Sequence, residues 1–292
     1  MKKKNYAYKD VINACERHWN EIKFELEKSK NPLAFFLAGQ SASGKGTLKH
    51  FMADGFLVID VDDFRKYHPD FFNLYKKYGK ESAKYTHDFA SAVADELILK
   101  GIENKADIFI DGTLKSFESP AKRAQLLNEN GYVCEVVAVA TKPEKSALAN
   151  LMRYEEMLER KMIPRLAPPE VHDKCVKNFP STVSKLLEMN LVKKVRIFNR
   201  DMKLMYSSIK NELSPKQFIE KEFQRKWTKE EFSEFLKLEE KLYAKMKERN
   251  AEPIELEIAK FEIKNLKEKI NVEEQKTKRY TERGKYIKMK NR

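Results

Sequence analysis

The sequence predicts a three-layer α/β/α fold with a mainly parallel sheet. Short apolar runs without polar alternation are separated by segments of helical spacing, as expected when strands are covered on both faces. A glycine-rich turn, "GQSASGKGT" (39–47), follows the first of these runs. Such sheets bind their ligands at the carboxyl ends of the strands, and several acidic and hydroxyl side chains of this chain fall there.

Each element has its own signal in the sequence. The first 30 residues carry apolar positions at helical spacing among charges, and they predict a helix. Four apolar runs predict strands at "LAFFLA" (33–38), "FLVID" (56–60), "DIFID" (107–111) and "YVCEVVAVA" (132–140). Helices are expected between them, at "TLKHFMAD" (47–54), "HDFASAVADELILKGIE" (87–103) and "SPAKRAQLLNENG" (119–131), the last capped by Gly131.

After residue 144 the pattern becomes helical, apart from "VRIF" (195–198), which predicts a late strand. "SPKQ" at 214 and "TKEE" at 228 are helix-start signatures. Two apolar stripes are expected to be packing faces, namely Ile254, Ile258 and Phe261, and Ile263, Leu266 and Ile270. The expected domains are an N-terminal helix (1–30), a nucleotide-binding core (31–225) and a charged helical extension (226–292).

Composition excludes several classes of protein. The chain has 292 residues, a net charge of +13 and a mean hydropathy of -0.68, and no apolar run approaches the ~20 residues that span a bilayer. Much of the positive charge lies in Lys2–Lys4 and Lys276–Arg292, which is typical of solvated ends and argues against a nucleic-acid partner. The separate cysteines Cys15, Cys134 and Cys175 favour a reducing cytoplasm.

The glycine-rich turn departs at one position from the phosphate-loop pattern Gly-x-x-x-x-Gly-Lys-[Ser/Thr]. Gly46 occupies the position where a serine or threonine is usual, and the hydroxyl residue Thr47 comes one position later. A strand, such a turn and a helix N-terminus still form an anion site. We expect Lys45 to reach the β- and γ-phosphates of a nucleotide, with Mg²⁺ held by water, phosphate and a nearby acid. The expected nucleotide-binding residues are Gly39, Gln40, Ser41, Ala42, Ser43, Gly44, Lys45, Gly46 and Thr47.

Three acids close the second strand, in "VIDVDDFRKYHPD" (58–70). A carboxylate at a strand end that faces a phosphate loop can take a proton from an attacking hydroxyl or hold Mg²⁺. Asp60 and Asp62 share a side while strand geometry lasts, and Asp63 is expected to cap the next turn. Asp60 is the candidate Mg²⁺ ligand.

Two further groups of polar residues suit a transfer reaction. "DGTLKS" (111–116) ends the third strand, and its Asp111, Thr113 and Lys115 are expected to hydrogen-bond a polar acceptor. Arg153 and Arg165 lie on either side of a helix end. Arginine suits the charge that develops on a transferring phosphoryl group.

The order of these motifs resembles the zeta toxin family, which are kinases of bacterial toxin–antitoxin systems. The matching series is "GQSASGKGT", "VIDVDDFRKYHP", "DIFIDGT", "RYEEM", "PRLAPPEVHD" and "VRIFNR", over residues 30–225. The resemblance implies a phosphate-loop kinase core. It also implies transfer of the γ-phosphate of ATP or GTP to the 3′-hydroxyl of UDP-N-acetylglucosamine, which poisons cell-wall precursor synthesis, and a small helical antitoxin as partner.

The resemblance also implies roles for individual residues. Lys45 resembles the loop lysine, and Asp62 in "DVD" resembles the catalytic base that contacts the acceptor. Arg153 in "RYE" and Arg165 in "PRLAP" resemble the arginines that hold and neutralise the transferred phosphate. The implied sugar-nucleotide contacts are Asp111 and Thr113, in the place of a Glu-Gly-Thr motif, and Asp95 on the preceding helix.

Departures from the family pattern leave alternatives open. Asp111 replaces the family's glutamate, which motivates a second hypothesis: a kinase of the same fold that acts on another nucleotide sugar, a nucleotide or a nucleic-acid end. A third hypothesis is a nucleotide-gated regulatory protein with little turnover, against which the retained base and arginines argue. The helices after residue 225 are left to dock on the core, bind a partner or inhibit in cis.

Overall fold

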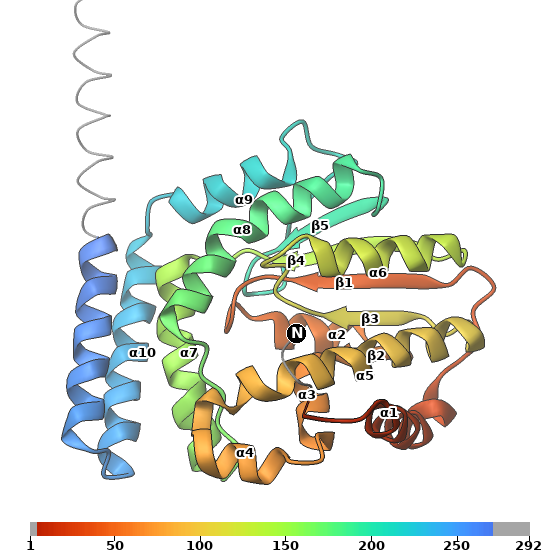
Figure 1. Ribbon diagram of the computed structural model, residues 1–292. Helices are drawn as coiled ribbons and strands as arrows, with labels where there is room; N and C mark the ends of the chain where they lie inside the picture. The colour runs from red at the N-terminus through yellow and green to blue at the C-terminus, as the bar shows by residue number, and fades with distance from the viewer. Residues whose placement is uncertain (1–4, 271–292) are drawn as a thin grey trace, which may run out of the picture. The chain divides into compact units, whose positions relative to one another are not determined.

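The computed structural model describes residues 5–270, and these include a six-stranded sheet (Figure 1). The strand order is β2-β3-β1-β4-β5-β6, and all neighbours are parallel except β5 and β6. The strands are β1 (Leu33–Ala38), β2 (Leu57–Asp60), β3 (Ile108–Asp111), β4 (Val133–Val139), β5 (Lys194–Phe198) and β6 (Leu204–Ser207). The predicted α/β class with a mainly parallel sheet is confirmed.

Helices separate the strands much as the sequence predicts, although the helices between residues 61 and 82 and the edge strand β6 were not predicted. Short 3₁₀ turns occupy Lys23–Glu25, Arg65–Tyr67 and Gly79–Ser82. The α-helices are α1 (Tyr8–Ile22), α2 (Lys45–Met52), α3 (Val61–Phe64), α4 (Phe71–Tyr78), α5 (Ala83–Asn104), α6 (Glu118–Glu129), α7 (Pro143–Glu159), α8 (Pro169–Glu188), α9 (Pro215–Gln224), α10 (Lys229–Glu248) and a last helix over 253–270.

The sheet has helices on both faces. On one face Leu48 of α2 packs with Phe35 and Leu37 of β1. On the other face, Cys134 of β4 lies within 3.8 Å of a backbone oxygen of α6, and Figure 1 shows α5 beside α6 there. Because both faces are covered, the strands need no polar alternation, which explains their uniform apolar sequence.

Gly101 allows α5 to lie close to the sheet. A Cβ at this position would come within 2.7 Å of Leu57 Cδ2 and 2.9 Å of Ile108 Cδ1. We therefore expect Gly101→Ala to lower the free energy of unfolding by about 1–3 kcal/mol, the usual cost of overpacking. Urea denaturation followed by circular dichroism measures this change. Gly131→Ala is not a suitable control because of its φ of +83°, whereas Gly46 has no atom within 4 Å of a built Cβ; a loss for Gly101→Ala no larger than for Gly46→Ala contradicts the expectation.

Both helix-start signatures act as predicted. At α9, the Gln217 backbone N–H donates to Ser214 Oγ, and the Ser214 N–H donates back to Gln217 Oε1. At α10, Thr228 and Glu231 make the same reciprocal pair. Each pair satisfies N–H groups that have no partner within the helix, so these two helices begin where the local sequence dictates.

The described residues form two compact units. The first takes residues up to 40, then 44–140 and 173–218, and it contains the whole sheet. The second takes 41–43, 141–172 and the residues from 219 onward. This division differs from the predicted boundary at 225–226, because α7 packs with α10 rather than only with its neighbours in sequence.

The second unit has its own apolar core. Leu148 and Met152 of α7 pack with residues of α10 and of the helix over 253–270. The predicted stripe of Ile263, Leu266 and Ile270 contributes to this core. The other stripe does not, since Ile254, Ile258 and Phe261 are 66%, 52% and 66% exposed within the described chain. The prediction that both stripes pack is therefore wrong for Ile254, Ile258 and Phe261, because among the described residues the helix buries only its other face.

The described residues bear on two expectations from composition. Cys15, Cys134 and Cys175 are buried and are not joined in a disulfide within this part of the chain. Burial raises the pKa of Cys15 to about 11 and that of Cys134 to about 12, so both are thiols at neutral pH. Among residues 5–270, no helix combines the length and the apolar character needed to cross a membrane.

Candidate active site

The glycine-rich loop connects β1 to α2, as predicted. Gly44 has a φ of +107°, and a Cβ there would lie 3.3 Å from Arg200 Cγ, so both the backbone conformation and the space favour glycine. Lys45 begins α2, and its Nζ donates to the carbonyl oxygens of Gly39 at 2.8 Å and Gln40 at 2.9 Å. These bonds hold the ammonium group against the backbone of the loop, at the N-terminus of α2.

The tip of the loop belongs to the second unit, and a network of side chains holds it there. Arg153 Nη2 donates to Ser41 Oγ at 2.8 Å and to Asn150 Oδ1 at 3.1 Å, and Ser41 Oγ lies 2.9 Å from the same amide oxygen. Thr141 Oγ1 donates to the carbonyl of Ser43 at 2.6 Å. The side chain of Arg153, predicted to bind phosphate, is therefore bonded to the tip of the glycine-rich loop.

Arg165 lies in the exposed segment between α7 and α8. The side-chain amide of Asn150 donates to the carbonyl of Ala167 at 2.8 Å, so Asn150 links the segment of Arg165 to the loop tip. The sequence analysis missed Asn150. Its spacing of three residues from Arg153, which places both on one helix face, was the signal that could have found it.

Lys49 brings together two of the predicted acids. Its Nζ lies 2.8 Å from Asp60 Oδ2 and 3.0 Å from Asp111 Oδ2. Burial opposes the charge on Lys49, but the carboxylates of Asp111 and Asp60 outweigh it and raise the pKa of Lys49. Burial also raises the pKa of Asp60, as do Asp111 and Asp63, while Lys49 opposes that rise. The sequence analysis missed Lys49, which stands one helical turn after the loop lysine.

The predicted base Asp62 lies on α3 and not on an extended strand. β2 ends at Asp60, which caps α3 by accepting the N–H of Asp62 at 3.0 Å; the cap predicted at Asp63 is therefore wrong. The carboxylate of Asp62 is half exposed and accepts from Arg65 Nε at 2.8 Å. Arg65 in turn donates to the Ala83 carbonyl at 2.6 Å. Asp62 thus has a defined position, and half of its side chain is exposed to solvent.

Helix α8 holds the backbone of the predicted acceptor segment. The thiol of Cys175 lies 3.3 Å from the carbonyl oxygen of Thr113, and the amide of Asn178 donates to the carbonyl of Lys115 at 3.1 Å. Leu114 between them has a φ of +47°. These contacts set the course of the segment that carries Thr113 and Lys115 beside Asp111.

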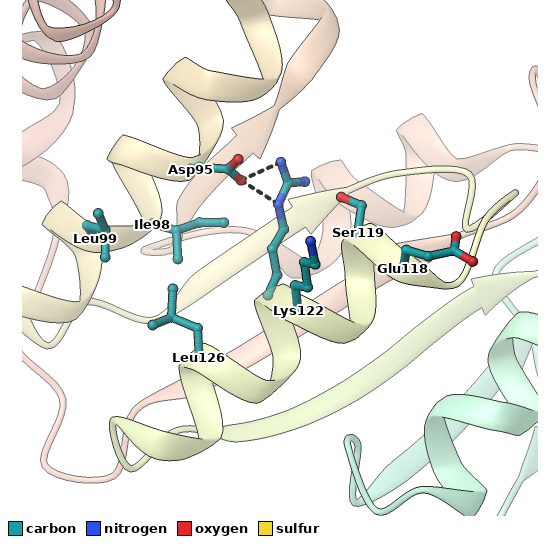
Figure 2. Close-up of a pocket in the computed structure, with 8 residues that line it drawn as sticks. Asp95, Ile98, Leu99, Glu118, Ser119, Lys122 and Leu126 are labelled. Atoms are coloured by element: carbon teal, nitrogen blue, oxygen red, sulfur yellow. Dashed lines mark hydrogen bonds and ion pairs between the residues drawn. The ribbon is translucent and has the colours of Figure 1, made fainter. Parts of the chain in front are cut away.

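Asp95 has different neighbours from those the sequence analysis expected. It lies midway along α5 and forms an ion pair with Arg123 of α6, at 2.7 Å to Nη2 and 2.8 Å to Nε. Figure 2 shows this carboxylate in a groove between the two helices, above the apolar side chains of Ile98 and Leu126. The structure therefore does not bring Asp95 together with Asp111 by any contact it describes in this part of the chain.

Asp60 does not fit the Mg²⁺ ligand that the sequence analysis expected. One of its oxygens accepts from Lys49 and the other from the N–H of Asp62. Within residues 5–270, no three His, Cys, Asp or Glu side chains gather as a metal site. The cluster at the ends of β2 and β3 already has its cation in the side chain of Lys49.

The sheet, the loop after β1 and the acids at the strand ends define an α/β protein with a kinase-like fold. Comparison with known proteins narrows this class. The family model of the Zeta toxin matches residues 16–211. The chain is 33% identical over 246 residues to "Toxin PezT" of Streptococcus pneumoniae serotype 4, which covers 82% of this chain and 97% of that protein.

Two more comparisons show similarity to toxins of the same family. "Toxin zeta" of Streptococcus pyogenes is 29% identical over 245 residues, or 82% of this chain and 85% of that one. A solved structure from the PezAT chromosomal toxin–antitoxin system of Streptococcus pneumoniae superposes with a TM-score of 0.74 at 31% identity, over 85% of this chain and 100% of that one. The chain belongs to the zeta toxin family.

Proposed function

We propose that this chain transfers the γ-phosphate of ATP or GTP to the 3′-hydroxyl of UDP-N-acetylglucosamine and thereby acts as a toxin on cell-wall precursor synthesis in the cytoplasm. The observation that carries the proposal is the placement of Asp62. Asp62 lies on α3, just after β2 ends, and its backbone N–H is bonded to Asp60 and its carboxylate to Arg65. In the same sheet, β1 leads into the glycine-rich loop. Membership of the zeta toxin family supports the same role.

Each residue has a defined part in the proposed reaction. Lys45 and the N–H groups of the loop bind the β- and γ-phosphates of the donor. Asp62 accepts the proton of the acceptor hydroxyl while the oxygen of that hydroxyl bonds to the γ-phosphorus. The bond from the γ-phosphorus to the bridging oxygen breaks, and the nucleoside diphosphate leaves. Arg153 and Arg165 neutralise the charge on the group in transit.

We place the sugar nucleotide against the segment of Asp111, Thr113 and Lys115, whose backbone is held by α8. Mg²⁺ is proposed to arrive with the donor, bound to phosphate oxygens and water, because Asp60 is engaged by Lys49 and Gly46 has no hydroxyl. There it would neutralise phosphate charge. Similarity to a solved structure from the PezAT toxin–antitoxin system supports a small helical antitoxin as the protein partner.

One observation favours a second candidate function. Asp111 is shorter than the glutamate of the family pattern, and its carboxylate is bonded to Lys49. A carboxylate held in this way has less freedom to accept hydrogen bonds from a sugar. The alternative is a kinase of the same fold whose acceptor is a different nucleotide sugar, a nucleotide or a nucleic-acid end.

Phosphate transfer tests the proposal directly. Purified protein is incubated with ATP, Mg²⁺ and a panel of UDP-sugars, nucleotides and oligonucleotides, and the products are identified by mass spectrometry. We expect phosphorylated UDP-N-acetylglucosamine, and a rate about 10²- to 10⁴-fold lower for Asp62→Asn, since a general base contributes this much. Asp54→Asn, at an exposed carboxylate beyond the far end of α2, is the matched control.

The outcomes separate the candidates. Product from UDP-N-acetylglucosamine with the wild type and Asp54→Asn, but not with Asp62→Asn, supports the proposal. Transfer only to another member of the panel supports the second candidate. Tight binding of ATP without transfer to any member, and without a difference between wild type and Asp62→Asn, refutes the assignment of Asp62.

The hydroxyl that the loop lacks can be restored. No atom lies within 4 Å of a Cβ built on Gly46, so a serine side chain fits there. We expect Gly46→Ser to lower the Mg²⁺ concentration needed for half-maximal rate by about 2- to 10-fold, on the scale of one polar interaction of 0.5–1.5 kcal/mol. Gly46→Ala, which adds the carbon without the oxygen, is the control. Equal Mg²⁺ requirements for the serine and alanine variants contradict this expectation.

A further inference from the structure

Two carboxylates lie side by side at the ends of β2 and β3. Asp60 and Asp111 are direct register partners in this parallel pair, and both side chains are largely buried, at 17% and 16% exposure. Two like charges this close repel one another strongly in a partly buried site. The pair therefore requires a proton, a metal ion or a cationic side chain between its members.

Lys49 supplies that cation. Its ammonium group contacts both carboxylates, at 2.8 Å and 3.0 Å, and its side chain is 26% exposed. These are lengths of charge-assisted hydrogen bonds, whereas Mg²⁺ binds oxygen at about 2.0–2.1 Å in octahedral geometry. The lysine comes from α2, the helix that begins with the phosphate-binding lysine, so one short helix provides both cations.

Asp60 links Lys49 to the proposed base, Asp62. Asp60 binds Lys49 through Oδ2 and the backbone N–H of Asp62 through Oδ1. An ion pair on one oxygen thus fixes the plane of the carboxylate, and the other oxygen fixes the start of α3. From this start the side chain of Asp62 reaches Arg65.

We propose that Lys49 is an internal cation that occupies the place a divalent metal would take between Asp60 and Asp111, and that through Asp60 it positions Asp62. Lys49 is accordingly a positioning residue and not a catalytic one. The first half of the proposal, that Lys49 replaces a metal ion between the two carboxylates, does not depend on the proposed function. The second half rests on the proposed function.

A metal-binding measurement without nucleotide tests the first half. Mn²⁺ is titrated into wild type, Lys49→Met and Lys49→Arg, and the free ion is followed by electron paramagnetic resonance. We expect one Mn²⁺ site in Lys49→Met that is lacking in the wild type and in Lys49→Arg, which keeps the charge. The double variant Lys49→Met/Asp111→Asn is expected to lose the site again. A Lys49→Met protein that binds Mn²⁺ no better than the wild type overturns the proposal.

Steady-state rates test the second half. We expect Lys49→Met to lower kcat on the order of 10²-fold, the effect of a small misplacement of a reacting group, with little change in the KM for ATP. Lys49→Arg is expected to restore most of the rate. An unchanged kcat in Lys49→Met, or a loss of equal size in Lys49→Arg, overturns the positioning role.

Two further measures keep the tests decisive. If Lys49→Met does not unfold cooperatively, Lys49→Gln, which can still donate to one carboxylate, takes its place in both experiments. If wild-type protein phosphorylates no acceptor, the proposed function fails, but the Mn²⁺ titration still decides whether Lys49 replaces a metal. The two failures are therefore distinguishable.

Discussion

Replacement of Lys45 by methionine is expected to lower kcat/KM for phosphate transfer by about 10²- to 10³-fold, the usual cost of removing one preorganised donor from a developing charge. In the structure, the ammonium group donates hydrogen bonds to the carbonyls of Gly39 and Gln40. Binding of a triphosphate offers it charged oxygens, and these make stronger hydrogen bonds than neutral carbonyls. Methionine keeps the length of the side chain but removes the charge.

Initial rates at several ATP concentrations measure the effect, and fluorescence titration with a labelled ATP analogue separates binding from transfer. Lys30→Met is the matched control, since Lys30 is exposed and precedes β1 at the end opposite the loop. If Lys45→Met binds ATP and transfers phosphate like Lys30→Met, the phosphate-loop assignment is wrong. A loss confined to Lys45→Met supports it.

Replacement of Arg249 by alanine is expected to destabilise the second unit by about 3–5 kcal/mol, because it leaves a buried carboxylate without its partner. Arg249 donates to both oxygens of Glu155, at 2.6 Å and 3.0 Å, and Glu155 is only 5% exposed. It also donates to Glu255 at 2.9 Å. The side chain therefore joins α7, α10 and the helix over 253–270, and α7 is the helix that carries Arg153.

Urea unfolding followed by the fluorescence of Trp227, which lies in the same core, measures this loss. Lys260→Ala is the control, because Lys260 is 58% exposed and pairs with an exposed Glu257 at 2.8 Å. Such surface pairs contribute about 0–1 kcal/mol. A loss for Arg249→Ala as small as that for Lys260→Ala would show that the buried pair does not stabilise the unit.

Local signals predicted the regular elements well. Runs of apolar residues identified five of the strands, and the capping pairs at Ser214 and Thr228 marked the first turns of α9 and α10. These signals succeed because strand burial and helix capping depend on residues within a few positions of one another. β6 was missed because it is a short edge strand with partly exposed residues and no uniform apolar run.

The candidate site was predicted only in part. Motif order predicts the loop, Asp62 and the two arginines. It does not predict which partner each charged side chain binds. The ion pairs of Asp60 with Lys49 and of Asp95 with Arg123, 28 residues away, were not predicted. An ion pair depends on which side chains a packed helix brings to a strand end, and this information is absent from the spacing along either element.

By itself, then, the sequence determines the kinase-like α/β class, the glycine-rich loop with Lys45 and the helix starts, because each depends on local backbone chemistry. The tertiary structure alone decides that Lys49 lies between two strand-end carboxylates and that α7 packs with the C-terminal helices. It also decides which apolar stripe of the last helix is buried, Ile263 at 1% exposure and not Ile258 at 52%. The physical reason is that burial and charge pairing are properties of surfaces in contact, and two equally amphipathic faces become distinguishable only when a partner covers one of them.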